Sequence, residues 1–213
     1  MKLTAEQIRT FKTDGLILVS DFWTAREVAA IQAELANLVR AGRLHNVKTE
    51  NDGKTHSKTE QNLQVCPIWY VSTFFRAAAF APKVIETVTA LIGEPVIEHL
   101  DQIFLKPARS GAPTNWHQDN AYFGISDPMM GVGMWTAVHA ANPANGTMRL
   151  IPGSHRQKFE HSRDPDSDHH IRCYPPEDNV VSANLPAGGA AFFCYGIAHA
   201  TGPNRTDGDR AEI

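Results

Sequence analysis

Residues 115–124, NWHQDNAYFG, place a histidine and an aspartate two positions apart in a run flanked by aromatic residues. If residues 116–122 form a strand, the side-chain period of two puts His117 and Asp119 on the same face. Both side chains could then contact one metal ion. Two polar residues on a solvated strand give the same pattern, so this pair needs support from the rest of the chain.

The sequence beyond residue 94 has the pattern of short apolar runs and turn residues that is typical of an all-β protein. Short runs rich in Val, Ile, Phe, Trp and Tyr alternate with clusters of Pro, Gly and Asn. Strands are expected at residues 96–105, 114–122, 133–140, 147–151 and 190–194, with shorter ones near 180–183 and at the C-terminal end. Residues 164–170 and 175–178 are expected to form a long exposed connection. The pattern predicts a jelly roll.

The first 94 residues are expected to be mainly helical. Thr4 and Thr24, each followed three residues later by Gln or Glu, have the form of capping boxes and begin two of the expected helices. Pro82 and Gly93 bracket a third helix. Residues 43–64 are polar and predict a long mobile loop, either a lid over a site or surface disorder.

The chain therefore reads as a single domain, 1–213, of mainly β class with packed N-terminal helices. Residues 1–94 provide helical support and the mobile loop, and residues 95–213 form the jelly-roll core. A chain of 213 residues can bury roughly 70% of the surface that its unfolded form exposes, so it needs no disulfide to stay folded.

Charge and cysteine content narrow the possible partners and the compartment. With 20 basic and 23 acidic residues dispersed along the chain there is no basic stripe, which argues against a nucleic-acid partner. Three cysteines outside any CxxC pair imply no disulfide framework. The polar N-terminus has no signal-peptide core and the chain has no membrane-length apolar run. We expect a cytoplasmic protein with a small-molecule substrate and no membrane partner, and the sequence leaves the oligomeric state open.

A second histidine is needed to complete a metal site around residues 117 and 119. Two histidines and one carboxylate form the facial triad that leaves open positions on Fe(II) for a cosubstrate and O2. His199 follows the most apolar run of the β half and is the preferred third ligand, because a ligand needs a dry, rigid wall behind it. His155 lies in a polar turn, and His139 is read as a polar residue at the barrel mouth.

Arg210 follows His199 by eleven positions in HATGPNRTDGDR. Its planar guanidinium suits bidentate recognition of a carboxylate. Thr201, two residues past His199, could add a hydroxyl donor to the same carboxylate. In isolation, an ordinary surface arginine is the alternative reading.

Five stretches occur together in one order: FLKP at 104–107, WHQDNAYF at 116–123, MWTAV at 134–138, NGTMRLIPGSH at 145–155 and HATGPNRTDGDR at 199–210. With these stretches the chain resembles the phytanoyl-CoA dioxygenase family of Fe(II)- and 2-oxoglutarate-dependent oxygenases. The resemblance implies a double-stranded β-helix of the cupin type. It also implies that His117, Asp119 and His199 are the iron ligands.

The same resemblance implies the cosubstrate subsite. Arg210 would pair with the distal carboxylate of 2-oxoglutarate, helped by Thr201. Trp135 corresponds to an aromatic residue that lines the cosubstrate pocket, although a plain core tryptophan is an equal reading. Gln102 and Lys106 fall where such enzymes place pocket-lining polar groups, with a solvent-facing lysine as the alternative.

One departure from the family concerns the C-terminal end. Relatives continue past the arginine with a closing strand, whereas this chain ends at Ile213, three residues later. Either the sequence is a fragment or the barrel edge is completed otherwise. Loss of an edge strand would loosen Arg210.

The resemblance implies a dioxygenase that hydroxylates a small organic or lipid-like substrate with Fe(II), 2-oxoglutarate and O2, releasing succinate and CO2. Asp119 favours hydroxylation, since halogenating relatives have a small residue at this position. Residues 124–133 would form a wall of the substrate site, and residues 43–64 are a second candidate for such a wall. A cupin-like protein that binds Mn or Zn on the same residues, or a catalytically silent binding domain, is the alternative.

Overall fold

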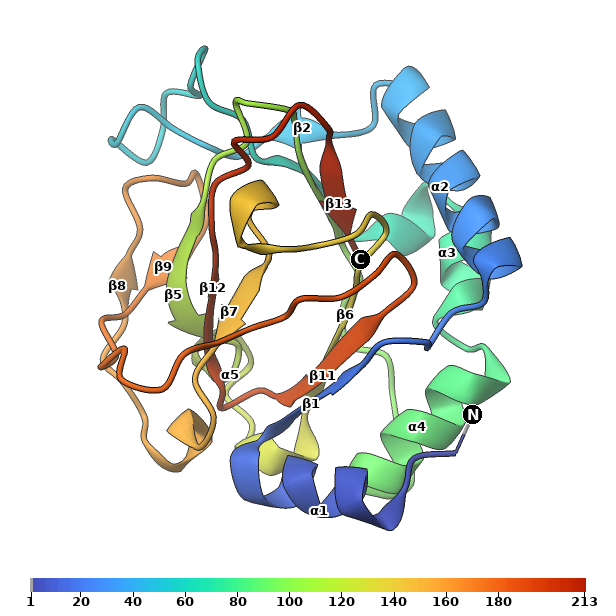
Figure 1. Ribbon diagram of the computed structural model, residues 1–213. Helices are drawn as coiled ribbons and strands as arrows, with labels where there is room; N and C mark the ends of the chain where they lie inside the picture. The colour runs from blue at the N-terminus through green and yellow to red at the C-terminus, as the bar shows by residue number, and fades with distance from the viewer. Residues whose placement is uncertain (1) are drawn as a thin grey trace.

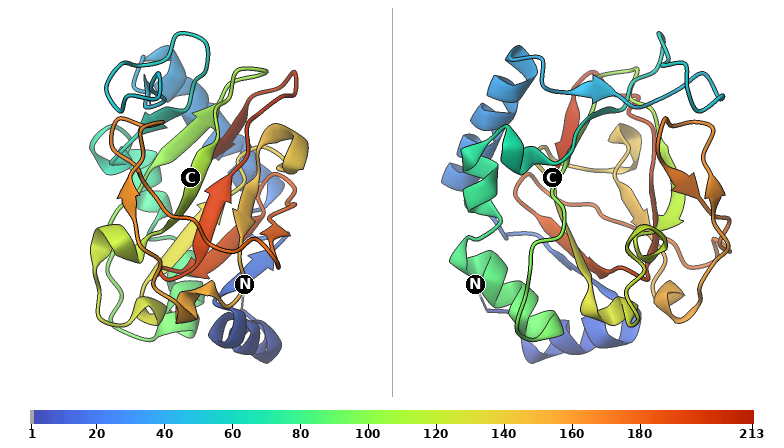
Figure 2. Two further views of the ribbon diagram at one scale, coloured as in Figure 1. Left: turned by 90° about the vertical axis from the view of Figure 1, so that its left-hand side faces the viewer. Right: turned by 180° about the vertical axis from the view of Figure 1, so that it is seen from behind.

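The computed structural model describes residues 2–213 and has helices packed against a group of antiparallel sheets (Figure 1). Helices α2 (Ala25–Arg40), α3 (Thr73–Ala78) and α4 (Pro82–Ile92) lie along one side of the strands in both the front and rear views (Figures 1 and 2). Strands β8 (Ser162–Arg163) and β9 (Ile171–Arg172) lie on the opposite side. Among residues 2–213, no helix has the length and apolarity that crossing a membrane requires. The mainly β fold with packed helices is the class predicted from the sequence.

Three helices form where the local sequence predicts them: α1 (Ala5–Asp14), α2 (Ala25–Arg40) and α4 (Pro82–Ile92). Both predicted capping boxes are present, with the hydroxyls of Thr4 and Thr24 accepting the backbone N–H three residues on. These bonds satisfy N–H groups that the first helical turn leaves without partners. A short helix α3 (Thr73–Ala78) was not predicted.

The strands form three larger antiparallel sheets and one hairpin. The first sheet has the order β1 (Leu16–Val19), β11 (Ala190–Cys194) and β6 (Val132–Thr136). The second has the order β10 (Val181–Ser182), β7 (Met148–Leu150), β12 (Ala198–Thr201) and β5 (Thr114–Gln118). The third has the order β13 (Arg210–Glu212), β4 (Ile103–Lys106), β3 (Leu63–Val65) and β2 (His45–Asn46). The hairpin consists of β8 (Ser162–Arg163) and β9 (Ile171–Arg172). Strands far apart in sequence are therefore neighbours, as in a jelly roll.

The hydrophobic core ties the helices to these sheets. One cluster joins α1 and α4 to the β1–β11–β6 sheet through side chains such as Phe11, Leu91 and Phe192. A second cluster packs the apolar face of α2 onto β3 and β4, with Leu35 against residues such as Ile103. The cavity described below opens between these helices and sheets.

The long loop predicted over residues 43–64 contains regular structure that the sequence did not predict. This segment contains β2 and reaches β3, and Val47 and Thr49 within it are 0% and 1% exposed. Its polar residues satisfy one another: the amide oxygen of Asn46 accepts the backbone N–H of Asn62 at 2.9 Å. Much of the segment is exposed, in line with its polar composition, but Thr49, Ser57, Asn62 and Gln64 are buried polar residues, which composition alone does not reveal.

The long strand predicted over residues 96–105 is also wrong in its first part. Only β4 is a strand, and residues 96–102 have no partner strand. Ile97 is 85% exposed, while the Asp101 carboxylate accepts the backbone N–H of Ile68 at 2.8 Å. An apolar run produced the strand prediction, but its apolar side chains face solvent or the cavity instead of a sheet.

Residues 164–170 are not the exposed connection that was predicted. They join β8 to β9, and Asp164 and His170 are 2% and 8% exposed. Both oxygens of the Asp164 carboxylate accept from the Asn115 side-chain amide, at 3.1 and 3.0 Å, and the Asp166 carboxylate accepts from it at 3.3 Å. The segment is therefore fixed against β5, next to residue 117.

Candidate functional site

His117 on β5 and His199 on β12 face each other directly in the second sheet. Side chains that oppose each other on adjacent antiparallel strands project from the same face, so strand pairing alone brings the two imidazoles together. Their ring centroids are 4.2 Å apart. His117 and His199 are 82 positions apart in the sequence, so strand register and not a local motif brings them together.

Asp119 reaches the same point by a different route from the predicted one. Strand β5 ends at Gln118, and Asp119 has helical backbone angles, φ −58° and ψ −32°, at the start of the short helix α5 (Asn120–Phe123). The prediction that one strand presents both residues by alternation is therefore wrong. The turn into α5 instead directs the carboxylate back, with its Oδ1 3.8 Å from Nε2 of His117 and 3.6 Å from Nε2 of His199.

The three side chains form a group that could hold a metal ion. One ligand atom from each of His117, Asp119 and His199 lies within 4.8 Å of the others, and within the described residues 2–213 this is the group of His, Cys, Asp and Glu side chains with that geometry. His199 is buried, and the other two are partly buried. Two imidazoles and a carboxylate on one small patch are the donor set of non-haem iron oxygenases.

Both imidazoles are oriented by the backbone. Nδ1 of His117 lies 2.8 Å from the carbonyl oxygen of Asn115, and Nδ1 of His199 lies 3.0 Å from that of Ile197. Each Nδ1 therefore bears the proton and donates it to the carbonyl, which leaves the Nε2 lone pair directed at the shared centre.

Burial keeps these two imidazoles neutral. It lowers the pKa of His117 to about 4, with the neighbouring His199 acting in the same direction, and it lowers the pKa of His199 to about 4. Burial also raises the pKa of Asp119, although His117 opposes that effect. A divalent cation at the centre would favour the deprotonated form of all three groups.

Aromatic rings surround the three side chains. The Phe193 ring lies 4.7 Å from the His199 ring, and the Tyr122 ring lies 6.0 Å from the His117 ring. His170 stacks on His117 at 6.5 Å with an interplanar angle of 6°. Sequence reasoning did not identify His170, because its position depends on the connection between β8 and β9 and not on a local motif.

The two histidines set aside from the sequence lie elsewhere. His155 belongs to a short 3-10 turn (Ser154–Arg156), and Nδ1 of His139 accepts the backbone N–H of Ala211 at 3.1 Å. Neither residue lines the cavity that contains His199.

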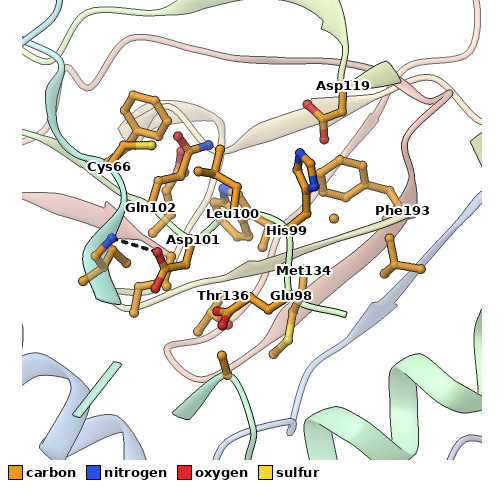
Figure 3. Close-up of a pocket in the computed structure, with 18 of the residues that line it drawn as sticks. Cys66, Glu98, His99, Leu100, Asp101, Gln102, Asp119, Met134, Thr136 and Phe193 are labelled. Carbon is orange, nitrogen blue, oxygen red and sulfur yellow. Dashed lines mark hydrogen bonds between the residues drawn. The ribbon is translucent and has the colours of Figure 1, made fainter. Parts of the chain in front are cut away.

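A cavity of about 440 Å³ opens onto the three side chains. In Figure 3, Asp119 and Phe193 lie at one end of the cavity, while Cys66 and Asp101 lie at the other. Its wall is largely apolar, with contributions from α3, α4, β6 and β11, and of residues 2–213 no lysine or arginine lines it. Of the 43–64 segment only Gln64 reaches the cavity, so that segment does not form the expected wall.

Three of the predicted cosubstrate residues line this cavity. Thr201 on β12 accepts the backbone N–H of Thr114 at 3.2 Å through its hydroxyl oxygen, which leaves the O–H free to donate. Trp135 on β6 is 5% exposed, and its indole N–H has no hydrogen-bond partner among the described residues. Gln102 accepts a 2.9 Å hydrogen bond from the side chain of Gln64.

Lys106, by contrast, does not line the cavity. It is fully buried on β4, and its ammonium group donates to the carbonyl oxygen of Ala112. The expectation that it lines the pocket, and the alternative of a solvent-facing lysine, are therefore both wrong. Burial, and next to it the Arg210 guanidinium, lower the pKa of Lys106 well below its usual range.

Arg210 is fully buried on β13, where it pairs with Lys106 of β4 in the sheet register. Its guanidinium donates to the carbonyl oxygens of Asn145 and Gly146, at 3.4 and 2.5 Å, and to the carboxylate of Glu212. It lies 5.8 Å from the Trp135 ring. Burial lowers the pKa of Arg210 to about 9.

Comparison with known proteins finds dioxygenases among the similar sequences. The family model described as "Phytanoyl-CoA dioxygenase (PhyH)" matches residues 11–211. An ectoine dioxygenase from Bordetella parapertussis is 23% identical over 230 residues, covering 99% of this chain and 74% of the relative. A probable alpha-ketoglutarate-dependent hypophosphite dioxygenase from Stutzerimonas stutzeri is 24% identical over 221 residues, covering 95% and 74%.

A solved structure of similar fold is the non-heme alpha-ketoglutarate-dependent carbocyclase SnoK from nogalamycin biosynthesis. It superposes with a TM-score of 0.81 at 19% identity, over 99% of this chain and 82% of that one. At this level of identity the likeness concerns the fold, a jelly roll of the cupin type.

The fold and the site define an oxygenase of the non-haem iron class. Since the family model spans nearly all of its length, the chain belongs to the phytanoyl-CoA dioxygenase family of Fe(II)- and 2-oxoglutarate-dependent oxygenases. This membership confirms the family, the fold class and the enzyme class predicted from the sequence, and with them the cofactor set of Fe(II), 2-oxoglutarate and O2.

Proposed function

We propose that this chain is a hydroxylase in which His117, Asp119 and His199 hold one Fe(II) ion. A small, largely apolar organic molecule is oxidised to an alcohol, with release of succinate and CO2. The observation that carries the proposal is the convergence of three ligand atoms within 4.8 Å at the wall of a cavity. Such a facial triad leaves coordination positions open for a cosubstrate and O2.

The residues present fit a divalent ion. Both imidazoles are neutral near pH 7, with pKa values of about 4, and their Nδ1 protons are held by carbonyl oxygens. The Nε2 lone pairs need neither deprotonation nor reorientation before they bind a metal. Asp119 adds one negative charge, which offsets part of the charge of the ion.

The residues present also fit the distal carboxylate of 2-oxoglutarate. The proposed anchor is Arg210, since its guanidinium suits a carboxylate and lies close to the cavity wall formed by Trp135. The unpartnered indole N–H of Trp135 and the hydroxyl of Thr201 supply further donors. A buried donor without a partner costs free energy, so a ligand that accepts from it is favoured. Gln102 is a further polar group in the same cavity.

When bound, Fe(II) would activate O2, and 2-oxoglutarate would supply two electrons through its decarboxylation to succinate and CO2, so that one oxygen atom of O2 enters succinate and the other the product alcohol. The protein orients the reactants and excludes water. Phe193 and Tyr122 pack beside the two histidines and shield them from solvent. Asp119 supports hydroxylation, because its carboxylate takes a position that a halide ligand would otherwise need.

The charge of the cavity wall supports a neutral or cationic substrate. A volume of about 440 Å³ suits a small organic molecule. Glu98 and Asp101 line the end away from Asp119, and no described lysine or arginine lines the wall. An anionic substrate such as an acyl-CoA thioester would meet these carboxylates without a compensating cation.

Anaerobic titration of the protein with Fe(II) and 2-oxoglutarate tests the proposal. We expect a weak visible charge-transfer band from the iron chelate, and succinate release once O2 is admitted. His117→Ala should abolish the band, whereas His45→Ala, an exposed histidine on β2, should leave it unchanged. Equal metal affinity in the wild type and His117→Ala would overturn the assigned ligand set.

A further inference from the structure

Strand β13 presents a cation and an anion to the interior of the barrel. Arg210 and Glu212 are two residues apart on this strand, so their side chains project from the same face. They are 0% and 6% exposed, and the guanidinium donates a hydrogen bond to the Glu212 carboxylate. Both charges of such a buried ion pair lose their hydration, so removing one partner leaves the other as an uncompensated buried charge, which costs free energy.

Glu212, and not Arg210, forms part of the cavity wall. The other hydrogen bonds of the guanidinium run to the carbonyl oxygens of Asn145 and Gly146. The carboxylate of Glu212 therefore occupies the acceptor position that the distal carboxylate of 2-oxoglutarate would take on Arg210. Two carboxylates on one guanidinium in a dry environment repel each other strongly.

Lys106 does not relieve this competition. It lies opposite Arg210 on β4, but its ammonium group donates to the carbonyl oxygen of Ala112, and no hydrogen bond joins it to Glu212. Burial and the Arg210 guanidinium also favour its neutral form. Arg210 and Glu212 thus neutralise each other, and an incoming carboxylate meets no net positive charge at the anchor.

The backbone that supports Glu212 is fixed, so its side chain alone can move. Glu212 pairs with Phe104 of β4 on one side and is bridged to Ala137 on the other. Ile213 exchanges two backbone hydrogen bonds with Thr136, at 2.7 and 3.2 Å. Release of Arg210 would therefore need only a rotation of the Glu212 carboxylate, which already lines the cavity.

We propose that Glu212 is a specificity-determining residue of the cosubstrate subsite: its carboxylate is an internal competitor that must leave Arg210 before 2-oxoglutarate binds. The inference rests on the proposed role of Arg210 as the anchor. It predicts weak intrinsic affinity for 2-oxoglutarate, and discrimination against ligands whose distal group is not a carboxylate, since only a second anion can replace the first.

The first test is binding of 2-oxoglutarate to the Zn(II)-loaded protein, measured by calorimetry without O2. Glu212→Gln keeps the shape of the side chain but removes its charge, and we expect about tenfold tighter binding. Glu98→Gln is the matched control, because it removes a carboxylate from the same cavity wall without touching Arg210. Unchanged or weaker binding in Glu212→Gln, or an equal gain in Glu98→Gln, would overturn the proposal.

A second test does not depend on the metal. Glu212→Ala exposes the guanidinium of Arg210 to the cavity, so sodium acetate should raise the thermal unfolding midpoint of this variant. Sodium chloride at the same ionic strength should not, and the wild type should show no acetate effect. If acetate fails to stabilise Glu212→Ala beyond the wild type, the competition proposal fails. If acetate does stabilise it while no variant binds 2-oxoglutarate, the proposed function fails instead.

Discussion

Acidification should destabilise the metal-free protein through the two buried imidazoles, and this dependence can be calculated. The pKa is 6.5 in the unfolded chain and about 4 for both His117 and His199 in the folded protein. Between these values the unfolded state binds more protons, so stability is present above pH 6.5 and is lost as the pH falls towards 4. The proton that each histidine takes up on unfolding therefore lowers the free energy of unfolding by about 2 kcal/mol between pH 7 and pH 5.

The pair should together remove about 4 kcal/mol, a large part of the stability of an ordinary domain. The variant His117→Gln/His199→Gln has no proton to bind at these positions, so its free energy of unfolding should fall by about 4 kcal/mol less than that of the wild type. Urea unfolding followed by tryptophan fluorescence at pH 7 and pH 5, with a chelator present, measures the difference. His45→Gln, an exposed control, should keep the wild-type dependence. An identical loss in the wild type and the double variant would refute the reasoning that these imidazoles are held neutral.

Three further changes separate metal binding, cosubstrate binding and folding. Asp119→Gly should abolish hydroxylation, and retained product formation in a mass-spectrometric assay would show that its carboxylate is not a ligand. Trp135→Phe removes the unpartnered N–H but keeps the ring, so calorimetry should detect a loss of about 1 kcal/mol in 2-oxoglutarate affinity with Zn(II) affinity unchanged; equal cosubstrate affinity would exclude that donor. Gly146→Ala should lower the unfolding free energy by about 2 kcal/mol, because its Cβ would lie 2.3 Å from the carbonyl oxygen of Gly202. Gly42→Ala shares the positive φ but meets nothing within 4 Å, so an equal loss there would assign the effect to backbone strain alone.

Helices were predictable from the sequence because their signals are local. The capping boxes at Thr4 and Thr24 and the apolar period of α2 lie within a few residues of the bonds that they form. Strand β1 also has a local signal, since LILV directly after Gly15 is a short, continuous apolar run, typical of a buried strand. Strand β3 had none, since its pairing with β4 involves residues about 40 positions away.

The site was predictable where a motif spans it and not where the fold assembles it. The HxD spacing and the apolar run before His199 point to the three converging side chains, although the alternation argument fails at Asp119. His170 and Glu212 have no motif. Their places depend on the β8–β9 connection and on the pairing of β13 with β4, and both are determined by long-range contacts.

The architecture also separates the proposed metal centre from the proposed cosubstrate anchor. His117 and His199 belong to the β10–β7–β12–β5 sheet and are aligned by pairing within it. Arg210 and Glu212 belong to the β13–β4–β3–β2 sheet, and the cavity lies between the two. A substitution on β13 is therefore expected to change the charge at the proposed anchor without shifting the register that aligns the two imidazoles. If these proposed roles hold, we expect substitutions in the ion pair on β13 to change 2-oxoglutarate affinity while the metal affinity of the cosubstrate-free protein stays the same.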